Sequence, residues 1–291
     1  MNPLHLALAV LVVFVWGGAF LVIKLGLQDI PPFLFCFLRF FLTSIPAVFF
    51  IKFPAAPRKM VILYGLFMFA LQFSLLFMGM YLGVTPGLAS LLMQTHVFFT
   101  SVLAVCFFGD KISSWQIGGA LVSFSGIALV GINTGGSLTL PGLLLVIAAA
   151  ASWGIGNVIS KKMGRVNMVA LVIWGSLVAW PPLLVLSLIF HGPMSMLASL
   201  QNISLLSLGS VAYITYISTL FGFGVWSFLL HHYRLPTIVP FTLLVPIVAI
   251  VSSALVFGET LQPWKILAGF LVIAGLCINI LGPRFFRPKK S

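Results

Sequence analysis

VWGGAFLVIK at residues 15–24 and SWGIGNVISK at residues 152–161 follow one pattern, in which Trp-Gly is followed by small residues, aliphatic residues and a closing lysine. A shift of 137 residues superposes the two stretches and lays Trp16 on Trp153. Two similar segments this far apart in one chain indicate that the chain contains an internal structural repeat.

A second pair of segments supports the duplication. FFGDKISSWQI at 107–117 matches VFGETLQPWKI at 256–266 after a shift of 149 residues. The sequence therefore predicts two homologous units, an N-terminal repeat at 1–134 and a C-terminal repeat at 135–291, the second ending in a short basic tail.

The composition places these units in a membrane. The 291-residue chain is 61% hydrophobic and only 6% charged, whereas a soluble domain carries about a quarter charged residues. The apolar runs also lack the polar–apolar alternation of outer-membrane barrel strands. Since about 20 apolar residues cross a bilayer as one helix, the sequence predicts ten spans, at 4–24, 33–51, 60–81, 87–108, 115–132, 141–160, 167–190, 204–230, 236–257 and 263–282.

The repeat and the span count together predict the topology. Each unit holds five spans, and an odd number makes the two units enter the membrane from opposite sides. The predicted fold class is therefore an all-α membrane protein with ten transmembrane helices, arranged as two inverted five-helix repeats.

The positions of the basic residues orient the chain, because Lys and Arg in short loops collect on the cytoplasmic side. Only Lys24 and Lys265 fall on the predicted outer side of the membrane, and Arg39 lies within a span. We therefore expect both termini in the cytoplasm and a multi-pass protein of the cell inner membrane. The remaining twelve of the fifteen Lys and Arg residues all fall on the predicted inner side: Lys52, Arg58, Lys59, Lys111, Lys161, Lys162, Arg165, Arg234, Arg284, Arg287, Lys289 and Lys290.

Several motifs resemble one family of transporters. WGGAFLVIKLGL at 16–27, LRFFL around Arg39, and the GD and GE hairpins with their trailing glycine-rich helices resemble the EamA-type drug/metabolite transporter family over essentially the whole chain. The resemblance implies two inverted bundles with alternating access to a central cavity. It also implies export of amino acids or related metabolites across the bacterial inner membrane.

Three shorter stretches narrow the resemblance. GLQDIPPFLFCFLRF at 26–40, GLASLLMQTHVFF at 87–99 and GNVISKKM at 156–163 are similar to bacterial exporters of O-acetylserine and cysteine. The expected function is therefore efflux of small amphipathic amino-acid metabolites such as these. A broad-specificity drug or other metabolite exporter of the same superfamily stays open as the alternative.

The fourth span carries two polar groups on different sides of the helix. Gln94 shares a stripe with Ser90 and Ser101, whereas His96 pairs with Thr100 about 200° around a continuous helix. Gln94 and His96 therefore cannot both point at the cavity centre, and which of them does so stays open. For His96, a helix–helix hydrogen bond and a role in proton coupling are both considered, since imidazole titrates near physiological pH.

Aromatic and amide side chains supply the other candidates for a substrate cavity. Trp153 and Asn157 lie one turn apart on the sixth span. An indole face attracts an ammonium group, and amides bind both ends of a zwitterion without burying a fixed charge. The expected lining comprises Trp16, Gln72, Gln94, His96, Trp153, Asn157, Trp174 and Tyr213.

Arg39 lies roughly two turns into the second span, where a charged side chain is costly unless it faces protein or a wet cavity. It can bind the carboxylate of a substrate, or it can snorkel outward and pair with Asp29 or a helix end. The three acids of the chain, Asp29, Asp110 and Glu259, all fall at predicted membrane interfaces. A carboxylate buried in mid-membrane as a cation or proton site is therefore not expected.

The remaining chemistry points away from catalysis. Cys36, Cys106 and Cys277 are isolated in apolar runs, which predicts neither a disulfide nor a metal site. No paired acid–base or metal-binding set lies within the spans, so we expect no enzyme and no cofactor. The expected partners are an amino-acid-like small molecule and membrane lipid, with no nucleic acid and no obligate protein partner.

Overall fold

The computed structural model describes residues 2–109, 113–133, 139–164, 166–233, 239–258 and 262–285. These residues form helices joined by short turns. The first repeat consists of α1 (Pro3–Gly26), α2 (Pro32–Ser44), η1 (Ala47–Phe49), α3 (Arg58–Tyr64), η2 (Gly65–Leu71), α4 (Gln72–Tyr81), α5 (Pro86–Met93), α6 (His96–Phe108) and α7 (Ser114–Ile132).

The second repeat follows the same order of elements. A π-helical segment interrupts its third span, as η2 interrupts the third span of the first repeat. The second repeat consists of α8 (Leu140–Met163), α9 (Met168–Gln201), α10 (Leu205–Ala212), η3 (Tyr213–Phe221), α11 (Gly222–His232), η4 (Val239–Leu244), α13 (Val245–Phe257) and α14 (Pro263–Phe285).

The predicted number of spans is confirmed. Within the described residues, 9 helices are long and apolar enough to cross a membrane, and the shorter apolar helix Phe241–Phe257 supplies the ninth predicted span. The predicted boundary between the units, at residues 134 and 135, lies outside the described residues, as do Asp110 and Glu259.

The segment 191–203, which separates two of the predicted spans and was expected to be a loop, is mostly helical. The helix α9 turns sharply at Gly192, where φ is 72°, and continues to Gln201. Glycine adopts this left-handed conformation without a steric penalty, and Pro193 directly after it is suited to start a new helical segment. The prediction of a loop was wrong because Gly192 and Pro193 end one helical segment and also start another.

The two repeats pack against each other with matching contacts. The first helix of each repeat, α1 or α8, packs on the second half of the fourth span of the other repeat, α13 or α6. The second helix of each repeat, α2 or α9, packs on the π-segment of the other, η3 or η2. The second, fourth and fifth spans also pair with their own counterparts, as expected for units related by a two-fold axis in the membrane plane.

Glycines at equivalent positions permit two of these close approaches. A Cβ atom on Gly17 would lie 2.5 Å from Cβ of Val248, and one on Gly154 would lie 2.8 Å from Cβ of Phe99. These two glycines are related by the 137-residue shift, so the repeated Trp-Gly motif places the first helix of each unit against its partner helix.

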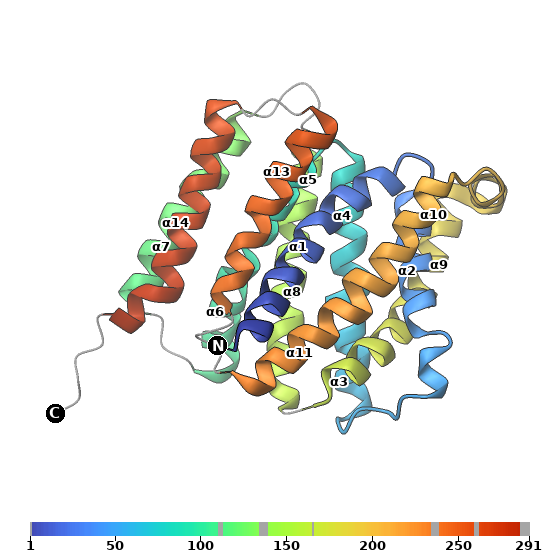
Figure 1. Ribbon diagram of the computed structural model, residues 1–291, viewed down its shortest axis with the longest axis horizontal. Coiled ribbons are helices and arrows are strands. Elements are labelled where there is room, and N and C mark those ends of the chain that lie inside the picture. Colours follow the sequence, from blue (N-terminus) through green and yellow to red (C-terminus); the bar gives the residue numbers. More distant parts are fainter. Residues whose placement is uncertain are drawn as a thin grey trace.

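The fifth spans, α7 and α14, run side by side at the left edge of Figure 1 and form the tightest small-residue interface. A Cβ atom on Gly119 would lie 2.5 Å from the carbonyl oxygen of Gly275. At the start of α7, Ser113 and Gln116 form a capping box, in which each side chain bonds the main chain of the other residue.

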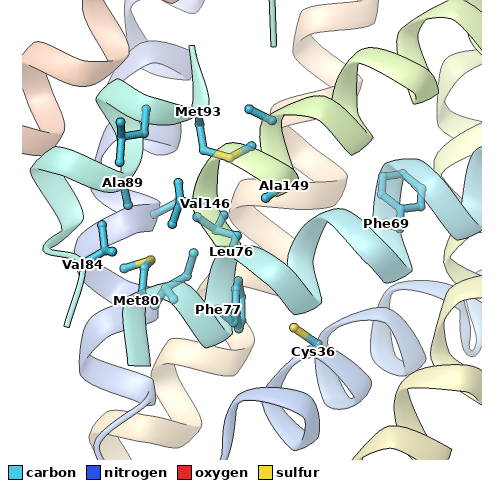
Figure 2. Close-up of a cluster of buried hydrophobic side chains, with 14 of the residues drawn as sticks. Cys36, Phe69, Leu76, Phe77, Met80, Val84, Ala89, Met93, Val146 and Ala149 are labelled. Carbon is cyan, nitrogen blue, oxygen red and sulfur yellow. The ribbon is translucent and has the colours of Figure 1, made fainter. Parts of the chain in front are cut away.

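The apolar core lies where the third and fourth spans of the first repeat meet the first helix of the second. Figure 2 shows Leu76 of α4 and Met93 of α5 near Val146 and Ala149 of α8. All four side chains are buried. The polar residues described below therefore lie among tightly packed hydrophobic side chains, where an unpaired polar group is costly.

Candidate functional site

The fourth span of each repeat is interrupted, and the two interruptions meet. In the first repeat, α5 ends at Met93 and α6 begins at His96. In the second, the 3₁₀ segment η4 precedes α13. The 149-residue shift places Gln94 next to Thr242, and the Gln94 side-chain amide donates a 2.8 Å hydrogen bond to the Thr242 carbonyl. Interrupted helices at corresponding positions of inverted repeats mark the substrate site in many transporters.

Gln94 and His96 point in different directions, although the helix between them is interrupted. The 200° separation of Gln94 and His96 assumed one continuous helix, whereas Gln94 and Thr95 form a turn between two helices. Gln94, which is 6% exposed, points across the repeat interface to Thr242. The His96 side chain instead contacts α8, the first helix of the second repeat.

His96, Trp153, Asn157 and Thr100 form what we call the α6–α8 cluster. The imidazole of His96 stacks on the Trp153 indole, with ring centroids 4.0 Å apart and planes 7° from parallel. The Asn157 amide donates a 3.1 Å hydrogen bond to Oγ1 of Thr100, which donates to the His96 carbonyl at 2.7 Å. His96 Nδ1 lies 2.9 Å from the Met93 carbonyl. Because that oxygen only accepts, Nδ1 carries the proton and Nε2 is the atom left to titrate.

Trp16 and Tyr213 both lie at the contact between α1 and η3, where each side chain bonds the main chain of the other element. The indole N–H of Trp16 donates a 3.1 Å hydrogen bond to the carbonyl of Ser218 in η3. The Tyr213 hydroxyl donates to the Val15 carbonyl at 3.0 Å. These two bonds fasten α1 to the π-segment of the second repeat. On the other side, Ser152 of α8 donates to the Phe67 carbonyl in η2 at 2.7 Å.

Arg39 is buried between α2, α4 and η3, with only 3% of its surface exposed. Its Nε and Nη2 atoms donate hydrogen bonds of 3.2 and 3.0 Å to Oγ1 of Thr219. Its guanidinium carbon lies 3.9 Å from the centroid of the Phe73 ring. Arg39 therefore neither snorkels outward nor pairs with Asp29.

The described surroundings of Arg39 supply no negative charge. Of the three acids, Asp29 is the one within the described residues, and its carboxylate accepts hydrogen bonds from the hydroxyls of Ser204 and Ser207. Burying an ion costs several kcal/mol. A cation–π contact returns about 2 kcal/mol and a hydrogen bond to a charged group about 1.5–3 kcal/mol. The guanidinium thus retains the capacity to bind an anion.

Two further polar atoms near these elements have no hydrogen-bond partner among the described residues. Gln72 is 3% exposed and its Oε1 atom is unpaired. Thr215 of η3 is fully buried and its Oγ1 atom is also unpaired. Gln72 directly precedes Phe73, the ring beneath Arg39, and Thr215 lies about one helical turn before Thr219. An unpaired buried polar group costs about 1–3 kcal/mol, so both atoms retain the capacity to form a hydrogen bond.

Trp174 is not brought to these groups. Its indole N–H donates a 3.1 Å hydrogen bond to the Ile51 carbonyl, in the linker before α3, and its ring packs against Phe53. Sequence reasoning missed Ser218, which contacts Trp16, Thr219, which contacts Arg39, and Thr215 on the same π-segment. The polar run TYIST at 215–219, inside an apolar span, is the signal that could have identified them.

The described part of the chain contains no group of ≥ 3 His, Cys, Asp or Glu side chains that could hold a metal ion. Cys36, Cys106 and Cys277 are free thiols. What the arrangement offers instead is a set of amides, hydroxyls, indoles and one guanidinium, grouped around interrupted helices between inverted repeats. That combination defines a multi-pass membrane transporter.

Comparison with known proteins gives the family. The model of the EamA-like transporter family matches residues 4–132 and 140–281, one match for each repeat. The chain belongs to the EamA-like transporter family, and it is a transporter rather than an enzyme.

Relatives of known sequence align over nearly the full chain. A "Probable amino-acid metabolite efflux pump" of Escherichia coli (strain K12) is 38% identical over 289 residues, covering 97% of each chain. A protein of the same description from Salmonella typhimurium is 37% identical with the same coverage. A solved crystal structure with 16% sequence identity superposes with a TM-score of 0.67, covering 99% of this chain and 100% of its own, which supports the fold.

Proposed function

We propose that the protein exports small amphipathic amino-acid metabolites, such as cysteine or O-acetylserine, across the inner membrane with both termini in the cytoplasm. The substrate binds between the repeats and is exposed to each side in turn. The observation that carries this proposal is the contact of Gln94 with Thr242, where the two interrupted fourth spans meet. The efflux pumps named above, which share 38% and 37% identity with this chain, support the substrate class.

The chemistry of the site supports a zwitterionic substrate rather than a lipophilic cation. Amides at Gln72, Gln94 and Asn157 bind polar groups of either charge, and the indoles of Trp16 and Trp153 attract an ammonium group. Among the described residues, no carboxylate lies within a span to bind a cationic drug or a coupling cation.

The direct test is transport by the purified protein in proteoliposomes. We expect uptake of labelled O-acetylserine that unlabelled cysteine inhibits and that a lipophilic cation such as tetraphenylphosphonium leaves unchanged. Inhibition by the cation, with no inhibition by amino acids, would replace this proposal by the broad-specificity drug exporter.

Proton coupling through His96 is the second part of the proposal, and a purely structural role between the helices α6 and α8 is its alternative. A coupled carrier responds to an imposed pH gradient, and His96→Ala removes that response while transport down a substrate gradient persists. Asn157→Ala is the matched variant, because it disturbs the same cluster without removing a titratable group. Transport that ignores the pH gradient and is unchanged in His96→Ala excludes the coupling role.

A further inference from the structure

We propose that Arg39 binds the carboxylate of the transported molecule, so that the protein selects substrates with a free carboxylate group. This inference rests on the proposed function and assigns one end of the substrate to one side chain. The site comprises the guanidinium of Arg39, the hydroxyls of Thr215 and Thr219, and the ring of Phe73.

The first argument is the unused edge of the guanidinium. Arginine has five N–H donors in a planar fork. The nitrogens Nε and Nη2 each donate a hydrogen bond to Oγ1 of Thr219. Among the described residues, Nη1 has no hydrogen-bond partner and the guanidinium forms no ion pair. The edge formed by Nη1 and Nη2 has the geometry that binds the two oxygens of a carboxylate.

The second argument is the way the side chain is held. Phe73 of α4 lies under one face of the guanidinium, with 3.9 Å between the ring centroid and Cζ. Thr219 in turn donates its own proton to the Ile214 carbonyl at 2.7 Å, so its oxygen is directed at Arg39 as an acceptor. These contacts orient a cation without neutralising it. A structural arginine in this position would be expected to meet a carboxylate or several carbonyl groups.

The third argument is the unpaired hydroxyl of Thr215, which is fully buried on the same π-segment. A carboxylate on Arg39 would offer this hydroxyl an acceptor. The neighbouring carbonyl, that of Ser218, is occupied by the Trp16 indole. The site therefore lies where the second helix of one repeat meets the π-segment of the other, next to the first helix.

The matching junction between α9 and η2 contains no such cation. There, Gly65 and Gly175 bring the main chains so close that a Cβ atom on Gly65 would lie 2.6 Å from the Gly175 carbonyl oxygen. The inverted repeat therefore offers one carboxylate site and not two, which fits a substrate with a single carboxylate.

The test compares a carboxylate with its ester. Labelled O-acetylserine uptake is measured in proteoliposomes while unlabelled O-acetylserine or O-acetylserine methyl ester competes. For the native protein we expect the free acid to compete on the order of 100-fold better, the effect of losing a charge-assisted bidentate pair. In Arg39→Met the preference should fall to about twofold or less, and Arg39→Lys should be intermediate, because an ammonium group lacks the fork.

The hydroxyl has its own pair of variants. Thr215→Val should reduce the preference for the acid several-fold. Ser253→Ala, which removes another buried and unpaired hydroxyl on α13, should leave the preference unchanged. Equal competition by acid and ester in the native protein, or an undiminished preference in Arg39→Met, overturns the assignment.

A binding measurement separates this inference from the proposed function. Thermal unfolding of the detergent-purified protein is recorded with a panel of amino acids and their methyl esters. If the native protein fails to transport O-acetylserine and cysteine, the proposed substrates are wrong. Stabilisation by free acids but not esters, lost in Arg39→Met, would still support the carboxylate site. Absence of any such difference in the native protein would refute it.

Discussion

The two π-helical segments occupy equivalent places in the two repeats, and each packs on the second helix of the other repeat, but different kinds of residue make the two contacts. η2 contacts α9 through Gly65 and Gly175, whose main chains nearly touch. η3 contacts α2 through the buried pair of Arg39 and Thr219. The inverted repeat thus keeps the backbone path and changes the chemistry. The junction of η2 with α9 is closely packed through glycines, whereas the junction of η3 with α2 contains a cation that has unused hydrogen-bond donors.

This difference indicates a division of roles between two copies of one unit. A junction closed by glycines tolerates no added atom, whereas a buried charge inside a membrane span is costly and often marks a functional site. We therefore expect substitutions at the η2 junction to act on stability, and substitutions at the η3 junction to act on transport.

The largest effect is expected for Gly65→Val at the packed junction. A Cβ atom there would lie 2.6 Å from the Gly175 carbonyl oxygen and 2.9 Å from Cβ of Val178, so the helices must separate. Overpacking of this kind costs about 3 kcal/mol, which thermal unfolding of the detergent-purified protein should detect as a lowered Tm.

Gly209→Ala is the control for the packed junction. A Cβ atom on Gly209, in α10 of the other repeat, meets nothing within 4 Å. Alanine should therefore stabilise the helix by about 0.5–1 kcal/mol. A Gly65→Val protein as stable as Gly209→Ala would contradict the view that η2 and α9 form a closed junction.

The opposite sign is expected for Arg39→Met at the η3 junction. Replacing a buried charge by an apolar side chain of similar length is often neutral or stabilising, by about 1–3 kcal/mol. The variant should therefore unfold at the same or a higher temperature, while its transport of amino acids becomes weaker and no longer favours the free acid. A clear fall in Tm would show instead that Arg39 is a structural residue and would remove the contrast between the junctions.

A matched pair of variants compares the first helices of the two repeats. Trp16→Phe removes the donor to the Ser218 carbonyl, and Ser152→Ala removes the donor to the Phe67 carbonyl. Each leaves one π-segment carbonyl without its side-chain donor. Each should therefore cost about 1 kcal/mol, measured as the shift in Tm. If only one of the two variants is destabilised, the π-segments are not held in equivalent ways.

The smallest effect is expected for Asp29, which links the turn after α1 to the start of α10. Hydrogen bonds from Ser204, and then Ser207, hold the pKa of the Asp29 carboxyl below its ordinary value of 3.8. A carboxyl with a lowered pKa stabilises the folded state above its ordinary pKa, and this contribution disappears as the pH falls through the lowered value. Asp29→Asn should lower Tm slightly at pH 7, and the difference from the native protein should shrink as the pH falls below 3.8 and disappear below the lowered pKa.

Much of the fold was predictable from the sequence. Long apolar runs gave the ten spans, and the repeated Trp-Gly motif gave the duplication, because both are local patterns. The helical segment after Gly192 was not predicted, because it lies beyond the apolar run that gave the span 167–190.

The details of the site depend on contacts between distant parts of the chain. The break at Gln94 and Thr95 has no glycine or proline to announce it, so the sequence did not reveal that the fourth span is divided there. The depth of Arg39 was visible in the sequence, but its partner Thr219 lies 180 residues away. The π-helical segments η2 and η3, one in the third span of each repeat, were likewise not visible in any local sequence pattern.

The central claim is that the substrate binds where the two interrupted fourth spans meet. Thr242→Cys tests it directly, because the carbonyl that accepts the Gln94 hydrogen bond belongs to the main chain and survives the substitution. The variant is made in a protein that carries Cys36→Ala, Cys106→Ser and Cys277→Ala, with Ser125→Cys on α7 as the control. We predict that O-acetylserine slows maleimide labelling at position 242 but not at position 125. Equal labelling rates at position 242 with and without substrate, in a protein that still transports it, would contradict the account.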